Sequence, residues 1–294
     1  MPPAAGLYAS LIFSLDGNYI YYVRAPNNQT AGTAYRVPTL GGEPQKLAAD
    51  VTANELTVSL AFSPDDKRMA FFRQDPGGVT TVVVAGTDGA GERKVASRRA
   101  PQFFNGLAWS PAGDLIALCV SNSSTGKSGV VTIPAGGGPE KPVGTEAWYA
   151  VWGVTWLPDS SGLLVTAEGS PGSPSQLWQL SYPGGEVRRI TNDLETYSNV
   201  SLTADSHALV AVQSDLLSNL YVLPPGEKKR AQQITSGPGK QEGYGGLSWL
   251  GDDRIAYTSK AGGSPEVWAV NVDGSHATQL TRRSDFGTLF AARA

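Results

Sequence analysis

Residues 60–66 read LAFSPDD, residues 107–113 read LAWSPAG and residues 11–17 read LIFSLDG, which are three versions of one phrase. Weaker copies follow in phase: VTWLPDS from Val154, VSLTADS from Val200 and LSWLGDD from Leu247. The copies start at residues 11, 60, 107, 154, 200 and 247, so successive copies are 46 to 49 residues apart. A repeat of this length built from short strands indicates a propeller or a similar array rather than a conventional enzyme core.

A second phrase follows each copy of the first. It is a polar, glycine-rich turn and then a short segment that ends in Leu-Thr or a similar pair. Its copies span residues 39–47, 86–95, 134–143, 182–191, 223–235 and 271–281. Glycine tolerates the positive φ that tight hairpin turns require, so each copy predicts a hairpin between two strands.

The repeat from residue 58 to residue 96 predicts four strands, at Val58–Ser63, Arg68–Arg73, Thr80–Ala85 and Glu92–Ala96. Charge on the last of them is expected for an outer edge strand, where it discourages pairing with other sheets. Four antiparallel strands per repeat is the pattern of a propeller blade. We therefore expect an all-β chain that folds as a single six-repeat β-propeller domain over residues 1–294. Its blades are expected at about 9–50, 56–97, 104–144, 151–192, 197–236 and 245–282.

Large aromatic residues recur at two positions of the repeat. In the first strand they are Phe13, Phe62, Trp109, Trp156 and Trp249. In the third strand they are Tyr35, Trp178, Tyr221 and Trp268. We expect the first set to pack between blades and the second set to lie in the core. The single cysteine, Cys119, lies in the apolar stretch LIALCVS and is expected to be a buried, unreactive thiol.

The repeat resembles the TolB-type, WD-like propeller repeat, most clearly at Leu60–Phe72 and Val267–Thr281, and the likeness extends over essentially the whole chain. More narrowly, YRVPTLGGEPQKL at 35–47, QLWQLSYPGGEVRRITND at 176–193 and SLTADSHALVAVQSDLLSNLYV at 201–222 resemble the extracytoplasmic propeller of bacterial Ser/Thr protein kinases. That resemblance implies a sensor or scaffold region, in the periplasm or at the cell surface, that follows a kinase domain and a membrane helix. The kinase domain is absent from this sequence, and the triplet at 285–287, DFG, lacks the rest of a kinase signature.

The phase of the repeat leaves the completeness of the propeller open. A further period would begin near residue 294, where the sequence stops. Either six blades close by side-chain packing, or the propeller is an incomplete part of a larger one, and we favour a fragment of a longer chain. The first residues, MPPAAGLYAS, lack the basic and apolar regions of a signal peptide.

The sequence lacks the complete motifs of several kinds of catalytic and ligand-binding site. There is no Gly-x-Ser-x-Gly elbow, and the only histidines, His207 and His276, stand at expected strand starts. The stretch STGKS at 124–128 resembles the end of a phosphate loop, but residue 121 is Ser and a hairpin rather than a helix is expected. The Asp-Gly pairs at 88–89 and 273–274 lack the spaced carboxylates of a calcium loop. The sequence therefore predicts no catalytic residue, no metal site and no cofactor.

The composition argues against two classes of binding partner. The formal net charge of −3 lacks the basic footprint that nucleic-acid binding requires. No apolar run of membrane-spanning length occurs, so we expect no membrane contact within this segment.

The loops that lead into the first strands are the parts of the repeat that differ most, and they are rich in aromatic residues. Amphipathic rings at a channel mouth could hold a protein, a peptide or a glycan; the alternative is that they seal adjacent blades. The candidate contacts are Arg99, Gln102, Phe103, Phe104, Trp148, Tyr149, Trp152, Tyr197, Gln241 and Tyr244.

We therefore expect a non-catalytic ligand- or protein-binding propeller, the sensor or scaffold region of a bacterial receptor Ser/Thr kinase or of a TolB-like protein. The alternative is the gating propeller of a prolyl-oligopeptidase-like peptidase without its hydrolase domain. A stand-alone propeller lyase would need clustered His, Arg and Tyr side chains, and the whole sequence holds only two histidines.

Overall fold

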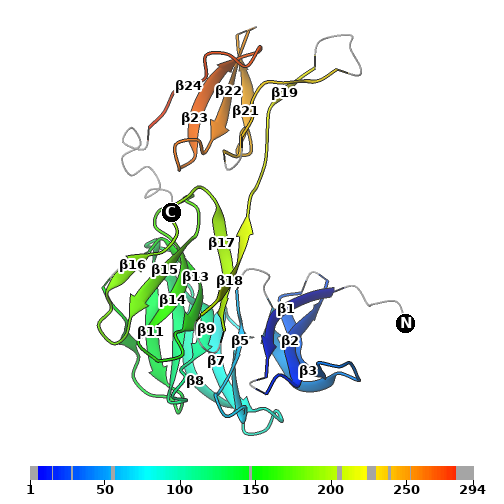
Figure 1. Cartoon of the computed structure of the whole chain (residues 1–294), viewed down its shortest axis with the longest axis vertical. Coiled ribbons are helices and arrows are strands. Elements are labelled where there is room, and N and C mark those ends of the chain that lie inside the picture. The colour runs from blue at the N-terminus through cyan, green and yellow to red at the C-terminus, as the bar shows by residue number, and fades with distance from the viewer. Residues whose placement is uncertain are drawn as a thin grey trace. The chain divides into compact units, whose positions relative to one another are not determined.

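The computed structural model describes residues 6–14, 16–27, 29–53, 57–145, 148–203, 207–223, 230–237, 240–251 and 253–282. Within these ranges every regular element is a β-strand, and the strands are joined into antiparallel sheets (Figure 1). None of the described segments forms a helix that is long and apolar enough to cross a membrane. The predicted all-β class is confirmed.

Every repeat except the fifth forms one four-stranded sheet whose strands pair in chain order. The first sheet contains β1 (Gly6–Phe13), β2 (Tyr19–Pro26), β3 (Ala31–Pro38) and β4 (Gln45–Thr52). The second contains β5 (Leu60–Phe62), β6 (Arg68–Asp75), β7 (Val79–Gly86) and β8 (Arg93–Arg99). The third contains β9 (Gln102–Trp109), β10 (Leu115–Asn122), β11 (Lys127–Pro134) and β12 (Lys141–Pro142). The fourth contains β13 (Ala150–Trp156), β14 (Gly162–Glu168), β15 (Gln176–Ser181) and β16 (Val187–Arg189). The sixth contains β21 (Leu247–Leu250), β22 (Arg254–Ser259), β23 (Glu266–Asn271) and β24 (Thr278–Gln279).

The fifth repeat corrects the expectation of a four-stranded blade over residues 197–236. Its strands β17 (Thr196–Leu202) and β18 (Leu209–Ser214) pair with each other, and β19 (Tyr221–Val222) pairs separately with β20 (Gln232–Gln233). The sequence explains why β19 is short, because the prolines at 224 and 225 that follow it have no N–H to donate to a ladder.

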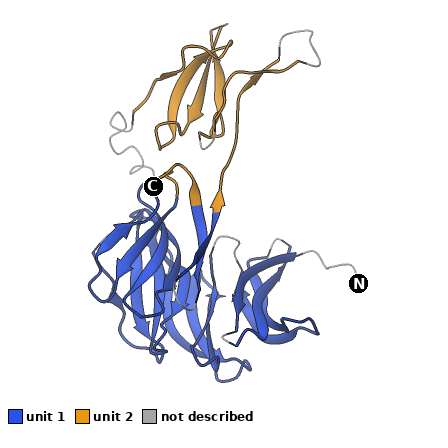
Figure 2. Cartoon of the chain, viewed as in Figure 1, with its two compact units in different colours: residues 1–170, 175–192, 197–212 blue, residues 171–174, 193–196, 213–294 orange. Residues whose placement is uncertain are grey.

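The chain divides into two compact units (Figure 2). Unit 1 comprises residues 1–170, 175–192 and 197–212, and unit 2 comprises residues 171–174, 193–196 and 213–294. The first four sheets belong to unit 1, whereas β19, β20 and the sixth sheet belong to unit 2. The single domain expected over residues 1–294 stays a prediction.

In unit 1, clusters of buried side chains pack each sheet against the next. Val23 of β2 shares a buried cluster with Phe71 of β6. Further clusters join the second sheet to the third and the third to the fourth. In unit 2, Leu220 and Ile234 of the fifth repeat pack with Tyr257 of the sixth sheet. Burial on both faces explains why the central strands β7, β10 and β14 are largely apolar.

The recurring serine of the first phrase has a local structural role. The Ser63 hydroxyl donates to Asp65 at 2.5 Å and accepts from the backbone N–H of Arg68 at 2.9 Å, so it ties the turn to the next strand. That hydroxyl bond, followed by the backbone N–H of Lys67, lowers the pKa of Asp65. The same backbone bond joins Tyr19 to Ser14 and Leu115 to Ser110.

The threonine that ends the second phrase works in the same way. Its hydroxyl accepts a backbone N–H within one residue of the start of the third strand, at 2.8 to 3.0 Å, in three repeats. The pairs are Thr191 with Leu177, Thr235 with Leu220, and Thr281 with Val267. Both recurring phrases therefore serve to build the sheets.

The aromatic residues of the first strand pack between sheets where a sheet precedes them. Phe62 stacks on Tyr21 with ring centroids 3.8 Å apart, and Trp156 Nε1 donates to the carbonyl of Ala108 at 3.3 Å. Trp109 is also buried. The prediction is wrong for Phe13, on β1 of the first sheet, and for Trp249, which follows the divided fifth repeat; both are more than half exposed. Tyr221, expected in the core, is exposed on the two-residue strand β19.

Cys119 is fully buried between the third and fourth sheets, as predicted, and burial raises the pKa of its thiol. Because the thiolate is the reactive form, we expect a maleimide reagent at neutral pH to leave the native chain unmodified and to label it once in denaturing urea. Mass spectrometry measures both states. Fast labelling of the native chain would contradict the described packing.

Candidate functional site

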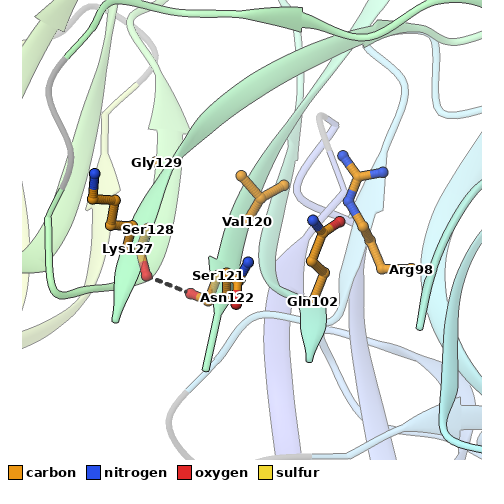
Figure 3. Close-up of a pocket in the computed structure, with 8 residues that line it drawn as sticks. All are labelled: Arg98, Gln102, Val120, Ser121, Asn122, Lys127, Ser128 and Gly129. Carbon is orange, nitrogen blue, oxygen red and sulfur yellow. Dashed lines mark hydrogen bonds between the residues drawn. The ribbon is translucent and has the colours of Figure 1, made fainter. Parts of the chain in front are cut away.

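A depression of about 190 Å³ opens at one end of the third sheet, where β10 turns into β11 and the chain enters β9. Its lining residues come from β8, β9, β10 and β11, all within unit 1 (Figure 3). We call it the third-sheet depression. It is lined by Arg98, Gln102, Val120, Ser121, Asn122, Lys127, Ser128 and Gly129.

Strand register arranges this lining in two rows. Asn122 of β10 pairs with Gln102 on one side and with Lys127 on the other, which gives a polar row at the end of the sheet. Two residues inward, Val120 pairs with Phe104 and with Gly129. Side chains two residues apart lie on the same face of a strand, so the second row forms an apolar floor beneath the polar one.

Gly129 leaves this floor open. It pairs with Val120, lines the depression and contributes no side chain to it. Phe104, in contrast, is buried and stacks on Phe72 of the second sheet, with ring centroids 5.8 Å apart. Val120 and Gly129 therefore line the depression, whereas Phe104 does not.

Arg98 forms the wall on the side of the second sheet. It makes an ion pair with Glu140, and its guanidinium lies 5.4 Å from the ring centroid of Phe104. These two contacts fix the side chain and balance its charge. The remaining charge of the lining is that of Lys127, which is exposed.

A buried hydrogen-bond chain supports the opposite face of the same strands. Asn105 Nδ2 donates to Ser121 Oγ at 2.8 Å, and Ser121 and Ser128 join through their hydroxyls at 2.7 Å. Ser128 in turn donates to the carbonyl of Tyr149 at 3.0 Å. Since that bond uses the hydroxyl hydrogen of Ser128, the hydroxyl hydrogen of Ser121 points to Ser128. Satisfied buried networks of this kind rigidify their surroundings.

The turn between β10 and β11 is a hairpin, as predicted, and not a phosphate loop. Asn122 Oδ1 accepts bonds from the backbone N–H and hydroxyl of Ser124, at 3.0 and 2.7 Å, and from the N–H of Thr125 at 3.3 Å. The acceptor of Asn122 is thus used within the loop. Its amide nitrogen has no partner among the described residues.

Of the predicted contacts, only Gln102 lines the depression. Arg99 is exposed at the end of β8, and its guanidinium lies toward Gly77 in the turn between β6 and β7. Phe103 is half-buried next to Gln102. Tyr149 is 40% exposed and lies against Gly126 of the β10–β11 loop.

Phe104 and Trp148 correct the prediction of a ligand-binding surface. Both are buried, Phe104 in the cluster between the second and third sheets and Trp148 in the cluster between the third and fourth. Trp148 packs edge-on against Trp178 with ring centroids 6.1 Å apart. These two rings seal adjacent sheets, which is the alternative that the sequence left open.

The other predicted contacts belong to elements outside the third sheet. Trp152 Nε1 donates to Glu168 within the fourth sheet at 3.0 Å, and Tyr197 lies on β17 of unit 1. Gln241 is half-buried and Tyr244 is 70% exposed, both in unit 2. The structure thus gathers Gln102, Phe103 and Tyr149 around the end of the third sheet.

The prediction missed Arg98, Asn122 and Lys127. Lys127 lies in the STGKS stretch, which was considered only as a phosphate loop. The available signal was the hairpin itself, because pairing β10 with β11 places Asn122 opposite Lys127. Within the described residues, no three His, Cys, Asp or Glu side chains gather to hold a metal ion.

No protein-family model and no curated protein sequence matches this chain. Among solved structures, a TolB protein from Agrobacterium tumefaciens is similar with a TM-score of 0.56 and 16% identity, over 93% of this chain and 80% of that one. TolB from Acinetobacter baumannii is similar with a TM-score of 0.55 and 15% identity, over 91% of this chain and 64% of that one. Prolyl oligopeptidase B from Galerina marginata gives 0.50 and 11%, over 93% of this chain and 42% of that one.

Identities this low establish the fold. The chain has the β-propeller fold of the TolB type, which confirms the predicted fold class. The resemblance to kinase-associated propellers stays a prediction.

Proposed function

We propose that this chain is a non-catalytic binding propeller that holds its ligand in the third-sheet depression. The observation that carries the proposal is the row of Gln102, Asn122 and Lys127 at the end of the sheet. The side chains of Gln102 and Lys127 have no hydrogen-bond or ion-pair partner among the described residues, and neither does the amide nitrogen of Asn122. Such groups, next to an open apolar floor on rigid strands, are typical of a ligand site.

The finer hypothesis is that the parent protein is a bacterial receptor Ser/Thr kinase or a TolB-like protein, with this propeller as its extracytoplasmic sensor or scaffold. Its support is the sequence resemblance over residues 35–47, 176–193 and 201–222. The partner would be a protein, a peptide or a glycan. The open reading frame around the chain tests this, because a kinase domain followed by a membrane helix upstream is expected.

The alternative, a gating propeller of a prolyl-oligopeptidase-like peptidase, is supported by the fold likeness to prolyl oligopeptidase B. The same reading frame separates the two. A downstream domain with a Ser-Asp-His triad would favour the peptidase, and an upstream kinase domain would favour the sensor.

The binding function is tested by a thermal-shift screen of peptides, muropeptides and glycans. We expect at least one class to raise the melting temperature, because a ligand at about 100 times its Kd adds about 2.7 kcal/mol to stability. In Gly129→Val the new side chain fills the floor next to Val120, so the shift should disappear. Valine favours strands, so this variant should itself fold and melt no lower than the wild type.

Two outcomes would contradict the proposal. One is a screen in which no class stabilises the protein. The other is a folded Gly129→Val variant that binds the same ligand with unchanged affinity.

A further inference from the structure

The lining of the third-sheet depression is dominated by hydrogen-bond donors. Lys127 offers an ammonium group, and Asn122 offers its amide nitrogen because its oxygen is already bonded to Ser124 and Thr125. Gln102 offers an amide NH2 group as donor and a carbonyl oxygen as acceptor. No Asp or Glu lines the depression.

The net charge of the lining also favours a ligand that accepts hydrogen bonds. Glu140 balances Arg98, so the ion pair leaves the charge of Lys127 as the net charge of the lining. The three residues of the polar row stand side by side across β9, β10 and β11 (Figure 3). A ligand group that presents acceptors and carries negative charge suits them best, because a charge-assisted hydrogen bond to the ammonium is stronger than one to a neutral acceptor.

The apolar floor further restricts the class of ligand that would fit the depression. Val120 and the open space at Gly129 lie one row inward from the donors. A compact anion would meet the polar row and leave the floor empty. A carboxylate attached to a small aliphatic group would use both rows at once.

We infer that the third-sheet depression binds a carboxylate group carried on a small aliphatic or sugar scaffold, with Lys127 as its charge partner and Gln102 and Asn122 as donors. This inference rests on the proposed binding function. Two sources share the chemistry, the free C-terminus of a peptide and the carboxyl group of an acidic sugar. Tyr149, exposed beside the same loop, is placed to contact the rest of the ligand.

The probes are N-acetyl-alanyl-alanine, its C-terminal amide, glucuronic acid, glucose and inorganic phosphate. Titrations are followed by the NMR signals of the side-chain amides of Gln102 and Asn122. We expect saturable shifts with at least one acid, and an affinity about tenfold weaker for its neutral counterpart, as for loss of a charge-assisted hydrogen bond. The acid that binds more tightly identifies the source.

Two lysine variants provide the control. Lys127→Gln should weaken binding of the acid about tenfold. Lys141→Gln removes the same charge from β12 of the same sheet, outside the depression, and should leave the affinity unchanged. Both side chains are exposed, so both variants should melt close to the wild type.

The inference is overturned if an acid and its neutral counterpart bind equally, if phosphate binds as tightly as the acids, or if Lys141→Gln weakens binding as much as Lys127→Gln. It is also overturned if no acid shifts either amide signal. The proposed function fails separately. If a neutral ligand from the thermal-shift screen is lost in Gly129→Val but retained in Lys127→Gln, the depression is a binding site and its carboxylate preference is wrong.

Discussion

Replacing Gly89 with alanine is expected to destabilise unit 1 by about 2–4 kcal/mol, through steric overlap and backbone strain together. Gly89 lies in the hairpin between β7 and β8 with φ of +82°. A Cβ at this position would lie 2.1 Å from the carbonyl oxygen of Leu47 on β4 of the preceding sheet. The added Cβ and the carbonyl oxygen of Leu47 are both held by the backbone, so the two sheets must move apart to relieve the overlap.

Gly91 provides the matched control. It lies in the same turn with φ of +68°, but a Cβ there would meet nothing within 4 Å. Gly91→Ala therefore carries only the strain of a left-handed residue, about 1–2 kcal/mol. Urea unfolding measures both. Equal losses in the two variants would show that the contact with Leu47 does not restrict the turn.

This comparison shows what the recurring glycine of the second phrase does. The sequence predicts a hairpin there because glycine permits positive φ, and that local reason applies to Gly91 as well as to Gly89. The contact with Leu47 comes from a residue more than forty positions away and is visible only in the structure. Local chemistry was therefore enough to predict the turn, but the packing of one sheet on the next was not.

For the whole fold, too, local structure could be predicted from the sequence, whereas the packing between sheets could not. Serine–aspartate turns and threonine-bonded strand starts form within a few residues or within one hairpin, and both were predictable from the two phrases. The fifth repeat was not predictable in this way. Its copy of the first phrase is degenerate, like those of the fourth and sixth repeats, yet only its strands divide into two separate pairs.

The candidate site was partly predictable for a related reason. Gln102 was found because the loops that lead into the first strands differ most among the repeats. Asn122 and Lys127 were missed because their proximity to Gln102 depends on register across three strands. Phe103 and Phe104 are adjacent and point to opposite faces of β9. The sequence shows two aromatic residues there, and only the sheet decides which one is buried.

Trp148→Ala is expected to cost about 3–5 kcal/mol, the usual cost of removing a large buried aromatic side chain. Trp148 is 4% exposed, packs against Trp178, and exchanges backbone hydrogen bonds of 2.7 and 3.0 Å with Ser128. A loss of this size is a large part of the 5–15 kcal/mol typical of a folded domain, so the urea midpoint should fall clearly.

Tyr149, the next residue, is the natural control for Trp148. Its side chain is 40% exposed, so Tyr149→Ala should change stability by no more than about 1 kcal/mol. If the tyrosine contacts the ligand, the same variant should weaken ligand binding. The opposite pattern would be a stable Trp148→Ala that loses binding and a Tyr149→Ala that unfolds. That result would mean that Trp148 contacts the ligand and that Tyr149 is a core residue. Because the two residues are adjacent in sequence and point to different surroundings, this pair separates a sealing role from a binding role in one experiment.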